Sequence, residues 1–151
     1  MPKTLMLMRH GDYADGHLNA RGAEQSDIVA GKLVKAALVP DVIIHSPLPR
    51  AVETAQRVRD VFNAVTGRDI PLVSHDALSE GRQSFPVSEI DEGASTALAV
   101  SHMPNIVMLY NMFSGGCTVP DNAQTYVIEA PVDSWRDFKR GHAAHIFLPY
   151  D

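Results

Sequence analysis

Short, continuous apolar runs alternate along the chain with apolar residues at helical spacing. Residues 4–8 and 42–44 are runs of the first kind, which are typical of strands that are covered on both faces. Residues 19–38 and 47–66 carry their apolar side chains on one helical face, so the pattern predicts a helix in each segment. The first half of the chain therefore reads as strand, helix, strand, helix.

Residues at the expected helix ends agree with these assignments. Asn19 is the expected N-cap of the first helix, and Pro40 closes that helix. Ser46 is expected to cap the second helix, with Pro47 at its first position and Gly67 after its end. Similar signals in the second half predict strands at 97–100, 126–129 and 144–148, a weaker strand at 70–74, a helix at 104–113, and an irregular segment with one helical turn at 79–95.

Strands that alternate with helices predict an α/β fold, a three-layer α/β/α sandwich with a mostly parallel central sheet. The length of 151 residues suits one domain that spans residues 1–151, and the sequence contains no repeat or linker that would divide it. The apolar run before Arg9 is far shorter than a signal peptide or the roughly 20 residues of a membrane span.

Composition and charge argue against two classes of binding partner, nucleic acids and anionic membranes. The chain is 45% hydrophobic and carries a net charge of −5, so bulk attraction to nucleic acid or to an anionic membrane is not expected. The single cysteine, Cys117, cannot form an internal disulfide, and we expect it to be a small core residue. We therefore expect a cytoplasmic protein without nucleic-acid or membrane partners.

Cationic or potentially cationic residues follow three of the predicted strands. Arg9 and His10 follow the first, His45 and then Arg50 follow the second, and His102 follows the strand at 97–100. Ligands of open α/β sheets bind beyond the carboxyl ends of the strands, where helix N-termini also favour anions. In an acidic protein this concentration of positive groups predicts a local phosphate or carboxylate site.

Four segments resemble the histidine phosphatase superfamily, which is also called the phosphoglycerate mutase-like family. Residues 9–11 read Arg-His-Gly, the signature after the first strand. Residues 18–25 are similar to Leu-Thr-x-x-Gly-x-x-Gln, with Asn19 in place of threonine. Residues 46–55 match Ser-Pro-x-x-Arg-Ala-x-x-Thr-Ala, and residues 101–102 read Ser-His. Four segments in this order and structural context make a chance match improbable.

The resemblance implies a phosphatase that works without a metal or other cofactor. His10 would attack phosphorus as a neutral imidazole and carry the phosphoryl group, while Arg9, Arg50 and His102 hold the phosphoryl oxygens. Two guanidinium groups and a protonated imidazole could supply the charge that phosphoryl transfer needs. Water would then release the phosphate.

The general acid is less clearly marked. The acid of the family lies in a Leu-x-Glu context, which residues 78–80 match, so Glu80 is the first candidate. Asp12 is the rival, with hydrogen bonding inside its loop as its alternative role. His45 either lines the rim of the site as a substrate-binding residue or is simply buried.

The connection at about residues 67–95 is short, whereas mutases and larger phosphatases of the family insert a helical cap there. This minimal layout, together with Arg-His-Gly-Asp and Ser-His-Met-Pro, is most similar to the SixA-type phosphohistidine phosphatases. The resemblance implies an open groove and, as substrate, a phosphorylated histidine on a signalling protein. A broad phosphatase of small phosphomonoesters and a non-catalytic phosphate-binding module are the alternatives.

Overall fold

The computed structural model describes residues 2–79 and 85–150. Its central six-stranded sheet has the order β5-β4-β6-β1-β7-β8, and β2 pairs with β3 in a separate hairpin. The strands are β1 (Lys3–Arg9), β2 (Tyr13–Ala14), β3 (His17–Leu18), β4 (Val42–His45), β5 (Leu72–Ser74), β6 (Thr96–Ser101), β7 (Thr125–Ala130) and β8 (His142–Phe147). The helices are α1 (Ala20–Lys35), α2 (Pro49–Thr66) and α3 (Asn105–Ser114), with 3-10 turns η1 (Asp76–Leu78), η2 (Val87–Glu89) and η3 (Trp135–Asp137).

Strand directions follow the sequence-based prediction. Strand β1 pairs in parallel with β6, β6 with β4, and β4 with β5. Strands β7 and β8 run antiparallel at the other side of the sheet. The predicted α/β fold with a mostly parallel sheet is therefore confirmed, and the carboxyl ends of four strands meet at one edge.

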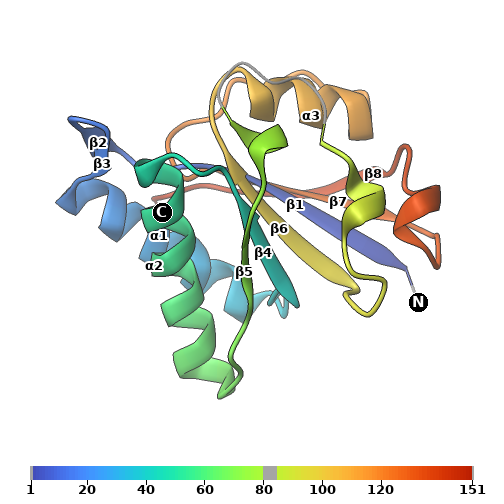
Figure 1. The fold of residues 1–151 in the computed structure, drawn as a ribbon, viewed down its shortest axis with the longest axis horizontal. Coiled ribbons are helices and arrows are strands. Elements are labelled where there is room, and N and C mark those ends of the chain that lie inside the picture. Colours follow the sequence, from blue (N-terminus) through green and yellow to red (C-terminus); the bar gives the residue numbers. More distant parts are fainter. Residues whose placement is uncertain (1, 80–84, 151) are drawn as a thin grey trace.

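The two faces of the sheet bury separate apolar clusters. Along β1, Leu5 and Leu7 point into the cluster beneath α3, and Met6 and Met8 point into the cluster beneath α1 and α2. This alternation is the period of two that a strand imposes on its side chains. Figure 1 shows the resulting layers, with α1 and α2 together on one side of the sheet and α3 on the other.

Helix starts follow the sequence in one case and differ in the other. The Asn19 side chain accepts a hydrogen bond from the Gly22 amide and so caps α1, as predicted. Helix α2 begins at Pro49 rather than Pro47, and its N-cap, Leu48, makes no side-chain cap bond. The prediction that Ser46 caps this helix was wrong, because the helix begins after Leu48; the Ser46 hydroxyl accepts from the Leu48 amide before the helix and also contacts His102.

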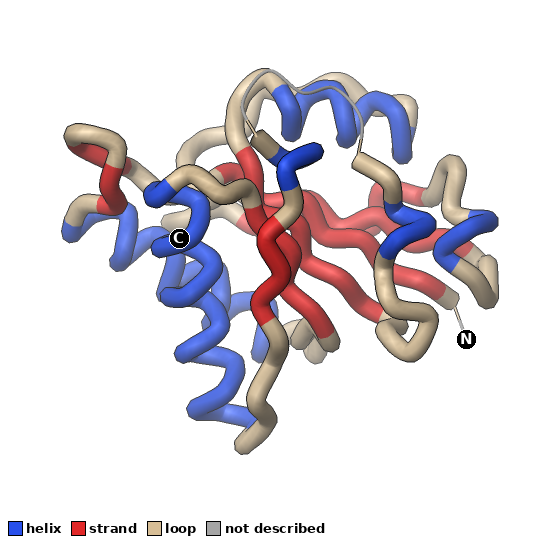
Figure 2. Tube along the Cα trace, viewed as in Figure 1, coloured by secondary structure: helices blue, strands red, loops and turns tan. Residues whose placement is uncertain are grey.

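The connection between α2 and β6 is short. Its described part holds only the edge strand β5 and the turns η1 and η2, which Figure 2 draws as one red strand and two short blue turns. The described residues of this connection therefore form no helical cap, as the sequence predicted.

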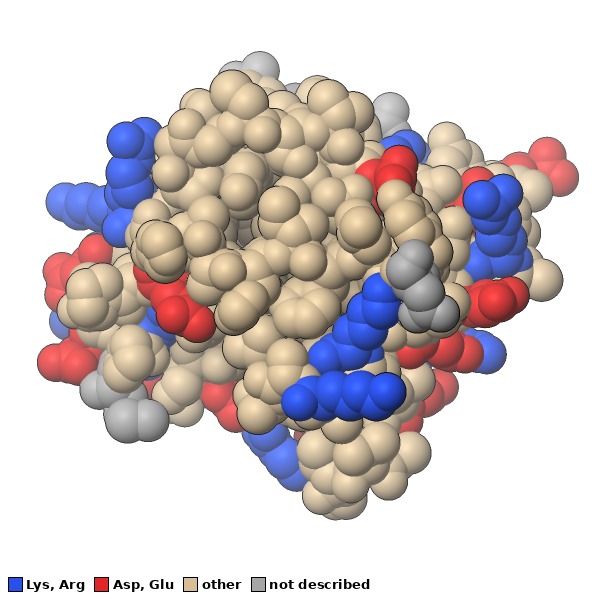
Figure 3. All heavy atoms as spheres, turned by 180° about the vertical axis from the view of Figure 1, so that it is seen from behind, with Lys and Arg blue, Asp and Glu red and all other residues tan. Residues whose placement is uncertain are grey.

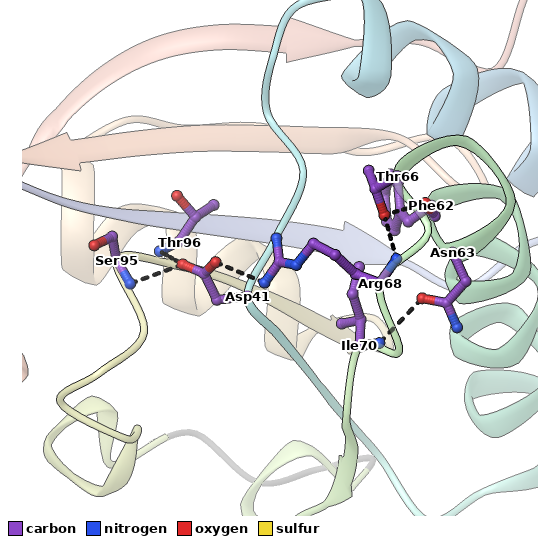
Figure 4. A network of polar contacts seen from close by, with 8 residues as sticks. All are labelled: Asp41, Phe62, Asn63, Thr66, Arg68, Ile70, Ser95 and Thr96. Carbon is purple, nitrogen blue, oxygen red and sulfur yellow. Dashed lines mark hydrogen bonds and ion pairs between the residues drawn. The ribbon is translucent and has the colours of Figure 1, made fainter.

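A polar network around Asp41 lies at the amino ends of the parallel strands, at the edge of the sheet opposite the carboxyl ends (Figure 4). Its carboxylate accepts hydrogen bonds from the Ser95 and Thr96 amides and pairs with Arg68 at 3.0 Å. Burial raises the pKa of Asp41, but the two amides and the guanidinium outweigh it and hold the pKa below its usual value. This network joins the starts of β4 and β6 to the end of α2, at the amino ends of the parallel strands.

Two residues away from the candidate site have clear positions in the fold. Trp135 is fully buried and its indole donates to the Ala94 carbonyl, so it belongs to the hydrophobic core. Cys117 is exposed, so its expected core position was wrong.

Figure 3 shows one face of the molecule, on which basic and acidic side chains are interspersed around a broad uncharged area. Among the helices of the described residues, none is long and apolar enough to cross a bilayer.

Candidate functional site

Three predicted site residues meet at the carboxyl edge of the sheet. His10 follows β1, Arg50 lies in the first turn of α2, and His102 follows β6. The Arg50 Nε donates to the Nε2 of His10 at 3.3 Å, and the His10 and His102 rings lie 5.1 Å apart between centroids. Their convergence follows from the topology, because β1 and β6 are neighbouring parallel strands.

The hydrogen bonds of His10 define which of its two ring nitrogens carries a lone pair. Its Nδ1 lies 2.8 Å from the carbonyl oxygen of Gly11, which can only accept a hydrogen bond, so Nδ1 carries the proton. The Nε2 atom then holds a lone pair and accepts from Arg50. This is the neutral tautomer that an attacking imidazole requires.

The loop that carries His10 is fixed to both neighbouring helices. The Gly11 amide donates to the Thr54 hydroxyl at 3.1 Å, and this hydroxyl donates to the Arg50 carbonyl at 2.7 Å. A Cβ atom on Gly11 would lie 2.6 Å from the Gly22 carbonyl oxygen, so the loop and the first turn of α1 pack backbone against backbone. The glycines of two sequence motifs are thus explained by one contact.

His102 is uncharged in the free protein. It is only 1% exposed, and its Nε2 lies 2.7 Å from the Ser46 hydroxyl. Burial, and then unfavourable electrostatic interactions with His10 and Arg50, lower the pKa of His102 from 6.5 to about 3. The expected protonated imidazole is therefore not present without ligand, and His102 acts as a neutral hydrogen-bonding group.

This low pKa predicts a specific acid sensitivity. The unfolded chain takes up a proton at His102 below about pH 6.5, whereas the folded protein does so only near pH 3, so acid favours unfolding across that range. We expect the wild type to lose up to about 1.4 kcal/mol of unfolding free energy per pH unit more than His102→Gln. Urea unfolding of both proteins between pH 7 and 4 measures the difference, and parallel curves would contradict it.

Arg9 is the last residue of β1 and directly precedes His10. Its Nη1 donates to the Pro120 carbonyl at 2.9 Å, which directs the guanidinium along the loop before β7. The buried Nε of Arg9 and the buried Nδ1 of His102 find no hydrogen-bond partner in the part of the chain that the structure describes. Buried polar atoms are nearly always paired, so the unpaired nitrogen of His102 beside His10 indicates a place for a ligand there.

The structure separates Asp12 and His45 from this set. Both Asp12 carboxylate oxygens accept hydrogen bonds from side-chain amides, those of Asn19 and Asn122. Asp12 therefore joins two loops, which matches its alternative role. His45 is buried with its Nδ1 at 2.9 Å from the Ser46 carbonyl, and within the described chain it makes no hydrogen bond or ring contact to His10.

Glu80 lies outside the described residues, but the chain leading to it is fixed near His102. The Ser101 hydroxyl donates to the Leu78 carbonyl at 2.6 Å, and the Asn105 side chain donates to the Ser79 carbonyl at 2.8 Å. Ser101 and Asn105 lie on either side of His102 in the sequence. The residues that precede Glu80 are thus held beside the site.

Sequence reasoning assigned no site role to three residues that the structure brings there. Ser46 contacts His102, Thr54 joins the His10 loop to α2, and Tyr13 contacts both His10 and Arg50. Ser46 and Thr54 stand inside a quoted motif, so their positions were visible but their contacts were not. Nowhere in the described chain do three His, Cys, Asp or Glu side chains form a group that could hold a metal ion.

Comparisons with solved structures show proteins of similar fold. The protein histidine phosphatase SixA bound to tungstate is similar in structure, with a TM-score of 0.79 and 19% identity over 97% of each chain. A mycobacterial glucosyl-3-phosphoglycerate phosphatase bound to VO3 has a TM-score of 0.66 and 15% identity, with 95% of this chain and 98% of that chain covered. Both likenesses concern the fold.

Sequence comparison gives the family. Mannitol-1-phosphatase of Eimeria tenella is 30% identical over 99 residues, which is 53% of this chain. The match spans only 32% of that relative, about a third of its length. The sequence model of the histidine phosphatase superfamily (branch 1) matches residues 5–83, more than half of the chain. The chain therefore belongs to the histidine phosphatase superfamily.

Proposed function

We propose that this protein is a metal-independent phosphatase that works through a covalent phosphohistidine on His10. The main supporting observation is the lone pair on the His10 Nε2, which accepts a hydrogen bond from Arg50. The His102 ring lies next to His10, and its buried Nδ1 has no hydrogen-bond partner in the described chain. A nucleophile surrounded by donors is the arrangement that phosphoryl transfer requires. Membership of the family supports the same chemistry.

The proposed reaction has two steps. In the first, the Nε2 lone pair of His10 forms a bond to phosphorus, and the bond from phosphorus to the leaving group breaks with its electron pair on that group. Arg9, Arg50 and His102 donate to the phosphoryl oxygens, where negative charge accumulates. In the second, water attacks phosphorus, and the electrons of the N–P bond return to His10 as phosphate departs.

The favoured substrate is a phosphorylated histidine on a signalling protein. The short connection between α2 and β6 supports this choice, because its described part has no helical cap that would enclose a small substrate. The structural likeness to a protein histidine phosphatase points the same way. The cytoplasmic location expected from the single cysteine stays a prediction.

A small phosphomonoester is the second candidate substrate, and a polar pocket favours it. The pocket has a volume of about 260 Å³ and adjoins the His10 loop at Asp12, with Arg21, Gln25 and Asn122 among its lining residues. Ligand clefts usually measure roughly 300–1,000 Å³, so this pocket suits a fragment of a substrate.

A comparison of substrates tests the proposal. With EDTA present throughout, we expect the protein to release phosphate from a phosphorylated histidine domain with a higher kcat/KM than from sugar and polyol phosphates. The reason is that an uncovered site can accept a side chain on a protein surface, and no metal is used. Phosphate release is followed with a coupled colour assay.

Three results would change the conclusion. Loss of activity in EDTA that a divalent ion restores would overturn the metal-independent mechanism. A higher kcat/KM for polyol phosphates would favour the second candidate. Absence of turnover on every substrate, including p-nitrophenyl phosphate, would leave only the phosphate-binding module.

A further inference from the structure

The β2–β3 hairpin, residues 13–18, is anchored to the helix that carries Arg50. The Leu18 amide donates to the Glu53 carboxylate at 2.9 Å, and the His17 Nδ1 lies 3.3 Å from both oxygens of this carboxylate. Glu53 follows Arg50 by nearly one turn of α2. The hairpin is therefore fixed to α2 next to the site rather than extending freely into solvent.

Tyr13, at the start of this hairpin, is 43% exposed and yet touches two site residues. The guanidinium carbon of Arg50 lies 4.7 Å from the centre of the Tyr13 ring, in cation–π geometry. The His10 ring lies 5.1 Å from the Tyr13 ring, with the two planes at 80°, which is the edge-to-face arrangement that aromatic rings favour. An exposed aromatic side chain at this position is thus held by contacts to the candidate nucleophile and to its neighbouring arginine.

These contacts bear on how Arg50 binds an oxyanion. A guanidinium group is planar, and it binds phosphoryl oxygens through a fork of N–H donors whose plane must be correctly oriented. An arginine side chain has several rotatable bonds, so an unsupported Arg50 would lose conformational entropy when it binds. Stacking on Tyr13 restricts the guanidinium before any ligand arrives, and the 3.3 Å hydrogen bond to His10 defines the direction of its Nε.

We infer that Tyr13 is a positioning residue of this site, and that the hairpin of residues 13–18, anchored by Glu53, holds the Arg50 guanidinium in its oxyanion-binding orientation. The inference rests on the proposed function, because it assigns Arg50 the phosphoryl oxygens. Tyr13 acts through Arg50 and His10 and does not itself need to touch the substrate.

The test is a double-mutant cycle with vanadate as the probe. Tyr13→Leu and Tyr13→Phe are made in the wild-type and Arg50→Ala backgrounds, and vanadate binding is measured by calorimetry beside p-nitrophenyl phosphate turnover. In the wild-type background, Tyr13→Leu is expected to weaken vanadate binding about 3- to 30-fold, the range of a cation–π contact. Tyr13→Phe keeps the ring and is expected to restore most of this loss.

In the Arg50→Ala background, the same Tyr13→Leu change is expected to alter vanadate binding less than about 2-fold, because the ring then has no guanidinium to hold. An equal loss in both backgrounds, or unchanged binding by Tyr13→Leu in the wild type, would overturn the inference. Thermal unfolding of each variant verifies that the proteins are folded. Vanadate binding does not depend on turnover, so a wild type that binds vanadate without hydrolysing any substrate would refute the proposed function and still test Tyr13.

Discussion

His10→Ala is expected to reduce turnover by on the order of 10⁴-fold or more, because no other group can form the covalent intermediate. The lone pair on its Nε2 is the proposed nucleophile, and the loop around it is held by the Gly11 bond to Thr54, which the substitution leaves in place. We therefore expect the variant to stay folded. Phosphate release and thermal unfolding are measured together.

Labelling gives an independent check of the same prediction. A brief reaction with a labelled phosphorylated substrate is expected to give a wild-type phosphoprotein that is stable in base and labile in acid, as phosphohistidine is. His142→Ala is the matched control, because His142 is exposed on β8. Comparable activity or labelling in His10→Ala would remove His10 from the mechanism.

Glu80→Gln is expected to slow the hydrolysis of alkyl phosphates by roughly 10²- to 10⁴-fold, the contribution of a general acid. An alkoxide is a poor leaving group and needs a proton. Phosphohistidine and p-nitrophenyl phosphate are expected to react at nearly the wild-type rate, because imidazole can carry its own proton and p-nitrophenolate leaves readily. The measurement is kcat/KM for the three substrates.

Glu129→Gln is the matched control for this prediction, since Glu129 is exposed on β7. An equal reduction of kcat/KM for all three substrates would make Glu80 a positioning or structural residue. Asp12 would then be the next acid to test, although both of its carboxylate oxygens already accept amide hydrogen bonds.

The sequence predicted the layers of the fold because the period of the apolar residues depends on burial. Met6 and Met8 alternate with Leu5 and Leu7 along β1, and this pattern needs a sheet covered on both faces. The hairpin at residues 13–18 was missed because strands of two residues are too short to show a period.

The site was predictable to the extent that it follows from the strand ends. His10 and His102 each follow a parallel strand, so their meeting could be expected from the order of the motifs. The neutral state of His102 could not be predicted from the sequence, because it depends on the burial of the ring and on its distance to Arg50. Ser46 has the sequence of a helix cap, and only the folded chain shows that its hydroxyl contacts His102.

The bond between the Gly11 amide and the Thr54 hydroxyl also makes that amide useful for spectroscopy. It lies one residue from His10, and its acceptor is tied to the main chain of Arg50. In the proposed mechanism, phosphorylation of the imidazole or a shift of the guanidinium changes the environment of this one N–H. The nitrogen resonance of Gly11 would therefore report in real time, without an added label on the substrate, how much of the protein carries phosphate during turnover.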